Sequence, residues 1–344
     1  MPVSRRTLLA YGAGLSGAAW LPAPAKADAQ AQPPGCWRRQ PSLPQRIQEI
    51  YPALHLGRIH VIGGLRGDEQ RVTGASDAHI AYDPLSGGSE LLTPLPEARH
   101  HPYAVSHRDR LYLFGGFTSR PGSVNWIMSA ETHVYAGNAW SRLTPAPGAN
   151  AEAVATSLGD RIHLVGGRTP RGEANLAYGD HADTARHVVY DPATDSWSTA
   201  APALSARNSA AGAVIDGLWH VAGGRHVSDG PSDAHEVYDP REDRWRTAAP
   251  MPTGSGAGGN AAGVIDGRLY VFGGEYFHAG GRVHAEVWSY DPKADAWQAA
   301  APMPTPRHGL GAVSAHGAIW LVGGARQPGG VATSDRVERF SLAC

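Results

Sequence analysis

Short apolar runs recur along the chain, and each is preceded by a polar turn and followed by two glycines. Leu111 to Phe114 and Leu269 to Phe272 are examples, and Asp266-Gly267 forms the turn before the second run. Runs of this length and composition, bounded by turn residues, are typical of β-strands. The glycine pairs begin at Gly63, Gly115, Gly166, Gly223, Gly273 and Gly323. Their spacing of about 50 residues indicates six copies of one strand-rich unit.

A second strand in each unit is marked by aromatic residues at fixed spacing. The sequence Tyr-Asp-Pro begins at Tyr82, Tyr190, Tyr238 and Tyr290. Seven residues after three of these tyrosines stand Trp197, Trp245 and Trp297. The glycine pair, the Tyr-Asp-Pro turn and the spaced tryptophan resemble the Kelch repeat, from about residue 37 to the end. The resemblance implies an all-β fold, a six-bladed Kelch β-propeller over residues 28–344 built from four-stranded antiparallel blades.

The last unit lacks a tryptophan-bearing outer strand of its own. Cys36-Trp37 precedes the first complete unit, and placing Trp37 seven positions after Phe340 supplies the missing strand. We therefore predict that an N-terminal strand completes the last blade. In this register Cys36 faces Cys344, and we predict a disulfide that joins the two ends of the propeller. Two free thiols are the alternative.

The N-terminal segment carries the pattern of an export signal. Two arginines in Ser-Arg-Arg-Thr-Leu-Leu, residues 4–9, are followed by an apolar run to Trp20 and by the small-residue cleavage pattern Ala25-Lys26-Ala27. Residues 1–27 resemble a twin-arginine signal peptide, which implies export to the periplasm or the cell exterior. The apolar run is too short to span a membrane as a helix, so we expect no membrane association after cleavage. An uncleaved membrane anchor is the alternative.

Charge and composition narrow the possible partners. The chain has 30 basic and 31 acidic residues, a formal net charge of −1, so it lacks the basic field that binds nucleic acid or a membrane surface. Two cysteines are too few for a cysteine-based zinc cluster. No cofactor is predicted.

Arginine recurs at one position in four of the six units. In a propeller, the segment that leads into the innermost strand and the segment after the glycine pair lie on one face, at the mouth of the central channel. The leading segments contain Arg46, Arg99, Arg207 and Arg307, with Asn150 at this position in the third unit. Further polar residues follow the glycine pairs or lie beside the recurring position, namely Arg168, Arg225, Glu275, His100, His101, Glu152, Asn208 and His308.

These residues predict a locally cationic mouth in a nearly neutral protein. Guanidinium groups bind carboxylate, phosphate or sulfate through parallel charged hydrogen bonds. We therefore expect the mouth to bind an anionic small molecule or carbohydrate, with an acidic peptide as a further candidate. The structural alternative is that each arginine stacks on an aromatic ring or pairs with a carboxylate such as Glu236 or Glu338.

The chain contains 17 histidines, several of which recur at repeat positions where packing explains them. These are His60, His163 and His220, and His79, His187 and His235. His100 and His101 could meet Glu152 across adjacent blades in a metal site. Their spacing matches no diagnostic metal motif, and no metal is predicted, although a metal-dependent enzyme stays an alternative.

Exported bacterial Kelch propellers also suggest an enzymatic alternative. The chain distantly resembles N-acetylneuraminate mutarotases, in which a glutamate after a glycine pair and an arginine a few residues later are the acting residues. Glu275 and Arg282 match these positions. The resemblance implies an isomerase in which the carboxylate moves protons and the arginine holds the sugar carboxylate. Ligand binding without catalysis and sugar-acid isomerisation are therefore alternative functions, with binding favoured.

Overall fold

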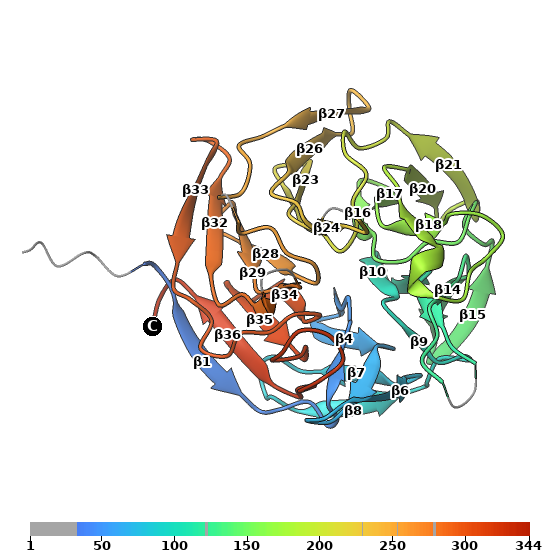
Figure 1. Cartoon of the computed structure of the whole chain (residues 1–344), viewed down its shortest axis with the longest axis horizontal. Coiled ribbons are helices and arrows are strands. Elements are labelled where there is room, and N and C mark those ends of the chain that lie inside the picture. The colour runs from blue at the N-terminus through green and yellow to red at the C-terminus, as the bar shows by residue number, and fades with distance from the viewer. Residues whose placement is uncertain (1–32, 121–122, 229, 253, 278–279) are drawn as a thin grey trace, which may run out of the picture. The chain divides into compact units, whose positions relative to one another are not determined.

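Each repeat folds into a four-stranded antiparallel sheet, which Figure 1 draws as one blade of a ring. The computed structural model describes residues 33–120, 123–228, 230–252, 254–277 and 280–344, and the predicted signal peptide at 1–27 lies outside them. Residues Pro33–Cys344 form one unit. Six such sheets are found among the described residues, which confirms the predicted all-β, six-bladed propeller.

Every blade runs from an innermost strand beside the axis to an outermost strand at the rim. In this order, blade 1 has β3 (Ala53–His55), β4 (Arg58–Ile62), β7 (His79–Tyr82) and β8 (Ser89–Leu92); blade 2 has β10 (Tyr103–His107), β11 (Arg110–Phe114), β14 (Thr132–Ala136) and β15 (Ala139–Leu143); blade 3 has β16 (Val154–Leu158), β17 (Arg161–Val165), β20 (His187–Asp191) and β21 (Ser196–Ala200); blade 4 has β22 (Ala211–Ile215), β23 (Leu218–Ala222), β26 (His235–Asp239) and β27 (Arg244–Thr247); blade 5 has β28 (Ala261–Ile265), β29 (Arg268–Phe272), β32 (Val287–Asp291) and β33 (Ala296–Ala300); blade 6 has β34 (Gly311–Ala315), β35 (Ala318–Val322), β36 (Val337–Ser341) and β1 (Cys36–Gln40).

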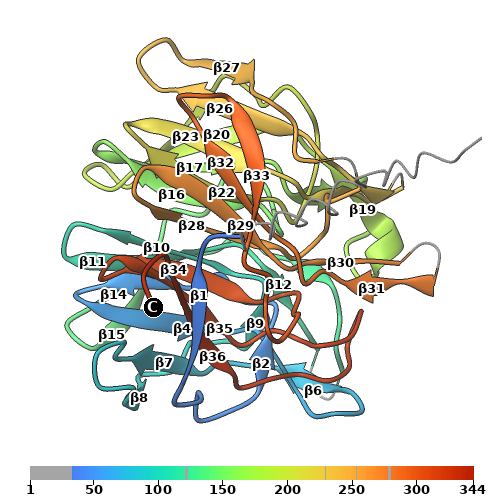
Figure 2. The same cartoon turned by 90° about the vertical axis from the view of Figure 1, so that its left-hand side faces the viewer.

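Shorter strands form ribbons from the segments before and after the glycine pairs. They are β2 (Ile47–Gln48), β5 (Leu65–Gly67) and β6 (Val72–Ala75); β9 (Arg99–His100), β12 (Phe117–Thr118) and β13 (Ile127–Met128); β18 (Arg168–Pro170) and β19 (His181–Asp183), with the 3-10 helix Tyr178–Asp180 before β19; β24 (Arg225–His226) and β25 (Gly230–Pro231); and β30 (Glu275–Tyr276) and β31 (Arg282–Val283). Figure 2 shows the ribbons β30–β31, β5–β6 and β18–β19 on the same side of the sheets. The described part of the chain has no helix with the length and hydropathy of a membrane span.

The innermost strands close the ring. They contact one another in the order β3, β10, β16, β22, β28 and β34, and β34 contacts β3 again. Blade 6 takes its outer strand from the N-terminal segment, where Trp37 pairs with Phe340 as Trp197 pairs with Tyr190 in blade 3. The predicted closure by an N-terminal strand is confirmed.

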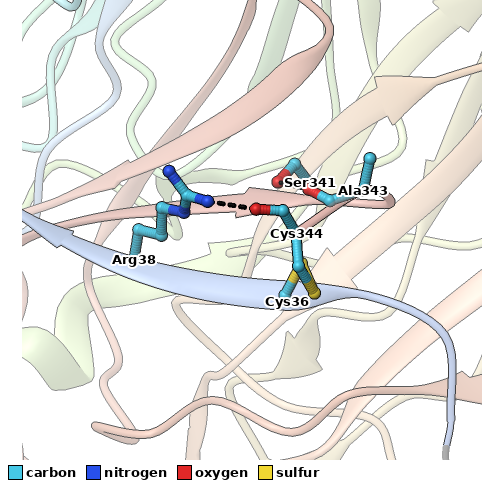
Figure 3. Close-up of a disulfide and its surroundings, with 5 residues drawn as sticks. All are labelled: Cys36, Arg38, Ser341, Ala343 and Cys344. Atoms are coloured by element: carbon cyan, nitrogen blue, oxygen red, sulfur yellow. Dashed lines mark hydrogen bonds between the residues drawn. A yellow bond between two sulfur atoms is a disulfide. The ribbon is translucent and has the colours of Figure 1, made fainter.

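The two ends of the described chain meet beside this closing strand (Figure 3). Cys36 and Cys344 form a disulfide with their Cα atoms 5.7 Å apart. The Arg38 guanidinium donates a hydrogen bond to the backbone oxygen of Cys344. A covalent bond and a charged hydrogen bond thus stand where the other blades have a continuous turn before the outer strand.

The recurring tyrosine and tryptophan hold neighbouring blades together. In blade 3 the ring centroids of Tyr190 and Trp197 lie 5.0 Å apart, and the Tyr190 hydroxyl donates to Asp195 at 2.6 Å. The Trp197 indole donates to the backbone oxygen of Thr144 in the preceding blade at 3.0 Å. Both residues are therefore structural, because each fills an interface and satisfies its polar atom there.

Three blades contain a pair of buried histidines on adjacent strands. Facing ring nitrogens lie 2.7 Å apart for His60 and His79, 2.9 Å for His163 and His187, and 3.0 Å for His220 and His235. Burial lowers the pKa of all six imidazoles to between about 3 and about 4. These residues pack within the blades, as their repeat positions predict.

Candidate functional site

Three of the recurring arginines are buried in their own blades instead of converging on the axis. Each guanidinium pairs with a carboxylate of the same blade: Arg99 with Glu131 at 2.7 Å, Arg207 with Glu236 at 2.6 Å and Arg307 with Glu338 at 2.8 Å. Arg207 also donates to the backbone oxygen of Gly223, the first glycine of its pair, at 3.0 Å. A buried guanidinium needs such partners to offset its lost hydration. The predicted cluster of four arginines is wrong, and the alternative of structural ion pairs holds for these three.

The fourth arginine is displaced by one residue from the repeat position. In other blades, the second glycine of a pair donates its N–H to the backbone oxygen of the recurring residue of the next blade, as Gly64 does to Arg99 at 2.9 Å. Gly324 makes the same bond to Ile47 at 2.8 Å, so Ile47 holds the equivalent place in blade 1. Arg46 lies at the surface and pairs with Glu69 at 2.6 Å. Asn150 fills the position in blade 3, where its amide donates to the backbone oxygens of Gly166 and Arg168.

Two residues after the recurring position, every blade turns sharply into its innermost strand. The turning residues all have φ between 53° and 66°: Glu49, His101, Glu152, Ser209, Gly259 and Gly309. This left-handed conformation suits glycine and costs other residues free energy. Glutamate and histidine nevertheless occupy it in blades 1, 2 and 3, so the turn holds these side chains at the axis at some cost in backbone strain.

Six side chains, one from each blade, form a closed ring of contacts that we call the axial ring: Glu49, His101, Glu152, Arg225, Glu275 and His308. Successive contacts measure 2.9 Å for Glu49–His101, 3.4 Å for His101–Glu152, 3.5 Å for Glu152–Arg225, 3.1 Å for Arg225–Glu275, 3.4 Å for Glu275–His308 and 3.3 Å for His308–Glu49. Carboxylates and nitrogen-bearing groups alternate. Arg168 pairs with Glu152 from outside the ring.

The ring carries charge although it is almost fully buried. Burial alone would raise the pKa of Glu49, but His101 and His308 hold it well below the usual value. Burial also opposes ionisation of Glu152, and the charges of Arg168 and Arg225 lower its pKa. Burial would lower the pKa of His308, but the neighbouring glutamates raise it. Glu49 and Glu152 are therefore ionised near neutral pH, and Glu275 pairs with the Arg225 guanidinium at 3.1 Å.

Hydrogen-bond partners place a positive charge on His101. His100 lies 2.9 Å from the backbone oxygen of Asn125 through Nε2, which must carry the proton, and burial lowers the His100 pKa to about 3. The remaining His100 nitrogen accepts from His101 Nδ1 at 2.7 Å, while His101 Nε2 faces Glu49 at 2.9 Å. Both His101 nitrogens donate, so its imidazole is cationic. With Arg168 and Arg225, it balances the three carboxylates. Both His100 nitrogens are engaged, so the structure does not support His100 as a metal ligand.

A cavity of about 440 Å³ opens above the axial ring. Glu49, His101, Arg225 and Glu275 line it on the side of the ring. Trp126, Tyr178 and Phe277 provide aromatic surface. A second cavity of about 520 Å³ shares Tyr178, Arg225, Glu275 and Phe277 with the first. On the other side of the ring, the innermost strands of the blades leave only about 110 Å³ along the axis.

Arg225 is the cation most accessible from both cavities. Its side chain is 14% exposed, and its guanidinium donates to Asn208, Glu275 and Glu152. Among the described residues these contacts use three of the five N–H groups of an arginine, which leaves two for a ligand. Asn208, a predicted ligand-binding residue, accepts hydrogen bonds from Arg225 and from Arg168, both at 3.3 Å. It therefore orients both guanidinium groups.

The pair suggested by the mutarotase resemblance does not assemble. Glu275 lies in the axial ring, but the exposed Arg282 pairs with Glu286 at 3.0 Å. On the β30–β31 ribbon Arg282 lies opposite Tyr276, next to Glu275. Glu49 and the aromatic residues of the cavity were not predicted from the sequence. Arg46 aligned blade 1 one residue before its true repeat position at Ile47, so the alignment did not place Glu49 at the turn.

Comparison with known proteins agrees with the architecture. A model of the Kelch motif matches residues 257–304. A solved structure described as "Structure of YjhT" superposes with a TM-score of 0.73 at 17% sequence identity, covering 86% of this chain and 95% of that chain. The fold is that of a Kelch-repeat β-propeller.

Curated relatives of this Kelch propeller are longer proteins. Kelch-like protein terF of Aspergillus terreus is 25% identical over 305 residues, which are 85% of this chain and 65% of that protein. Human Kelch-like protein 34 is 27% identical over 257 residues, 71% of this chain and 38% of that protein. The chain thus spans 65% or less of the length of these two relatives.

Proposed function

We propose that this Kelch propeller binds a small sugar acid at the mouth of its axial channel. The observation that carries the proposal is the pairing of an aromatic wall with the charged axial ring around one cavity. Aromatic rings pack on the apolar faces of sugars. Carboxylates accept hydrogen bonds from sugar hydroxyl groups, and imidazole N–H groups donate to them. The two N–H groups of Arg225 that have no partner in the described part of the chain suit a ligand carboxylate.

The charges of the ring favour a small acid over an acidic peptide. The positive charges of His101, Arg168 and Arg225 balance the three carboxylates, and protonation of His308 would add one positive charge. One ligand carboxylate fits this balance. A peptide with several carboxylates would face Glu49 and Glu275 at the cavity floor and be repelled.

Saturation-transfer NMR tests the proposal. N-acetylneuraminic acid, glucuronic acid, the methyl ester of each and a tetra-glutamate peptide are compared on the same protein. We expect transfer to the two acids and weaker transfer to the esters. Arg225→Gln should weaken binding of the acids by about thirtyfold, because it removes one charged hydrogen bond of about 2 kcal/mol.

Arg282→Gln is the matched control, because it removes an arginine from the neighbouring strand that lies outside the axial ring. Equal loss in both variants, or no binding of either acid by the parent protein, contradicts the proposal. The same spectra report exchange between sugar anomers. Acceleration of this exchange would favour the isomerase alternative, for which Glu275 is the one predicted catalytic residue that lines the cavity.

We also propose export of the protein. The disulfide between Cys36 and Cys344 supports it, since such bonds persist in oxidising compartments. Cell fractionation of the full chain and of an Arg5→Lys/Arg6→Lys variant tests this. Export that is unaffected by the double substitution would contradict the twin-arginine signal.

A further inference from the structure

We propose that the axial ring holds a divalent metal ion between Glu49, Glu275 and His308. These residues come from blades 1, 5 and 6, and one oxygen of each carboxylate and one nitrogen of the imidazole lie within 4.8 Å of one another. Two carboxylates and one imidazole form a common donor set for divalent transition metals. Glu49 and Glu275 also line the cavity, so the open side of the ion would face a ligand.

The spacing of the donor atoms matches metal ligands better than hydrogen-bond partners. His308 Nδ1 lies 3.3 Å from Glu49 Oε1 and 3.4 Å from Glu275 Oε2. Hydrogen bonds between charged nitrogen and oxygen are usually about 2.7–2.9 Å long. Two ligands that each lie about 2.1 Å from a tetrahedral ion are about 3.4 Å apart. Both nitrogen–oxygen distances therefore suit an ion between these atoms, and one oxygen of each carboxylate lies within 4.8 Å of the other.

His308 presents its Nδ1 atom to this space. Its side chain is 1% exposed, and its Nε2 lies 2.9 Å from the backbone oxygen of Gln327, which requires the proton on Nε2. The other nitrogen, Nδ1, is buried, has no hydrogen-bond partner among the described residues and is aimed at the two carboxylates. Histidine ligands of metals are typically fixed in this way, with the second nitrogen donating to a carbonyl.

The two carboxylates are also held from behind. His101 lies 2.9 Å from Glu49 Oε2, and Arg225 donates to Glu275 Oε1 at 3.1 Å, so the other oxygen of each group faces the proposed ion. Glu275 Oε2 also accepts the N–H of Gly329 at 2.7 Å. These contacts fix the carboxylates before an ion arrives, as outer partners do in metal sites.

The ion would give the proposed sugar-acid site its anion selectivity, and this consequence rests on the proposed function. A divalent ion adds two positive charges to the site, beside the guanidinium groups of Arg168 and Arg225. A sugar carboxylate or hydroxyl could then occupy the open coordination positions beside Arg225. The mixed oxygen and nitrogen donors favour Mn²⁺ or Zn²⁺ over Ca²⁺.

Metal titration without any sugar tests the inference by itself. The full chain is treated with a chelator, desalted and titrated with MnCl₂ and with ZnCl₂ by calorimetry. We expect one equivalent to bind. Glu49→Gln and His308→Asn should each weaken binding by at least about tenfold. His316→Gln is the matched control, because His316 is an exposed histidine of the same blade in the turn between β34 and β35, and it should leave binding unchanged.

Pulsed EPR of the Mn²⁺ complex supplies a second readout that does not depend on the variants folding. We expect a nitrogen coupling from one histidine in the parent protein, and a complex without this coupling would contradict His308 as a ligand. Absence of stoichiometric binding, or equal affinity in the parent and both ring variants, would overturn the inference. Repeating the NMR panel with chelator and with Mn²⁺ separates the two proposals. Metal binding without binding of either sugar acid contradicts only the proposed function, and binding of a sugar acid without metal binding contradicts only the metal site.

Discussion

Three blades bury a pair of histidines, and these pairs predict that the propeller loses stability in mild acid. In blade 3, burial lowers the pKa of both His163 and His187 to about 4. In the unfolded chain each imidazole has a pKa of about 6.5. Because the folded pKa is the lower one, the unfolded chain takes up protons first as the pH falls. The stability that the two neutral imidazoles contribute is therefore complete above about pH 7 and is lost between about pH 6.5 and 4.

The two pKa values set the size of the effect. At pH 5 they give a loss of about 2 kcal/mol per histidine, or about 4 kcal/mol for the pair of blade 3. Asp243 faces both imidazoles and favours their charged form, but burial is the larger effect. A whole domain is usually stable by only about 5–15 kcal/mol. The three pairs together should therefore remove much of this stability by pH 5.

Blade 5 supplies the substitution that tests this. Tyr270 and Val287 occupy the positions of His163 and His187 in the strand register. The double variant His163→Tyr/His187→Val carries this pair into blade 3. In the parent protein His187 is hydrogen-bonded to the backbone oxygen of Ala201. In the variant this oxygen keeps its hydrogen bond from the Trp245 indole, which is 2.9 Å long. The variant should fold without leaving a buried polar group unpaired.

Urea unfolding at pH 7, 6 and 5 measures the effect. The parent protein should lose stability steeply over this range, and the double variant should lose about 4 kcal/mol less between pH 7 and 5. Identical pH profiles for the two proteins would refute the assignment of acid sensitivity to the buried histidine pairs.

Two other changes address the closure and the buried arginines. Cys344→Ser should lower the free energy of unfolding by up to about 5 kcal/mol, because the bond to Cys36 closes a loop of 308 residues. Thermal unfolding of this variant with and without reductant measures the loss. A melting temperature equal to that of the parent protein contradicts the prediction. Arg207→Met should cost about 3 kcal/mol by leaving Glu236 buried without its partner, yet keep sugar-acid affinity in the NMR assay. Loss of sugar-acid affinity at unchanged stability would contradict a purely structural role and show that Arg207 contributes to binding.

The fold followed from the sequence because its determinants are local and repeated. The glycine pair recurs in all six units and the Tyr-Asp-Pro turn in four, so the copies reinforce one another. The register of Trp37 against Phe340 could be predicted because the other blades display the same spacing.

The site could be predicted only in part, since its members meet across blades. Arg99, Arg207 and Arg307 recur at one position, but a residue that repeats in several blades more often stabilises the blade that contains it. The axial ring instead uses positions that differ between blades, such as Glu49, where neighbouring units have histidine, glutamate, serine or glycine. Which of these side chains face one another depends on the closed ring, which the sequence does not reveal residue by residue.

A crystal structure of the protein soaked with N-acetylneuraminic acid tests the central claim most directly. We predict density for the sugar in the cavity above the axial ring, with its carboxylate within hydrogen-bond distance of Arg225 and its ring against Trp126, Tyr178 or Phe277. Density for the sugar only elsewhere, or an empty cavity at saturating ligand, would contradict the claim.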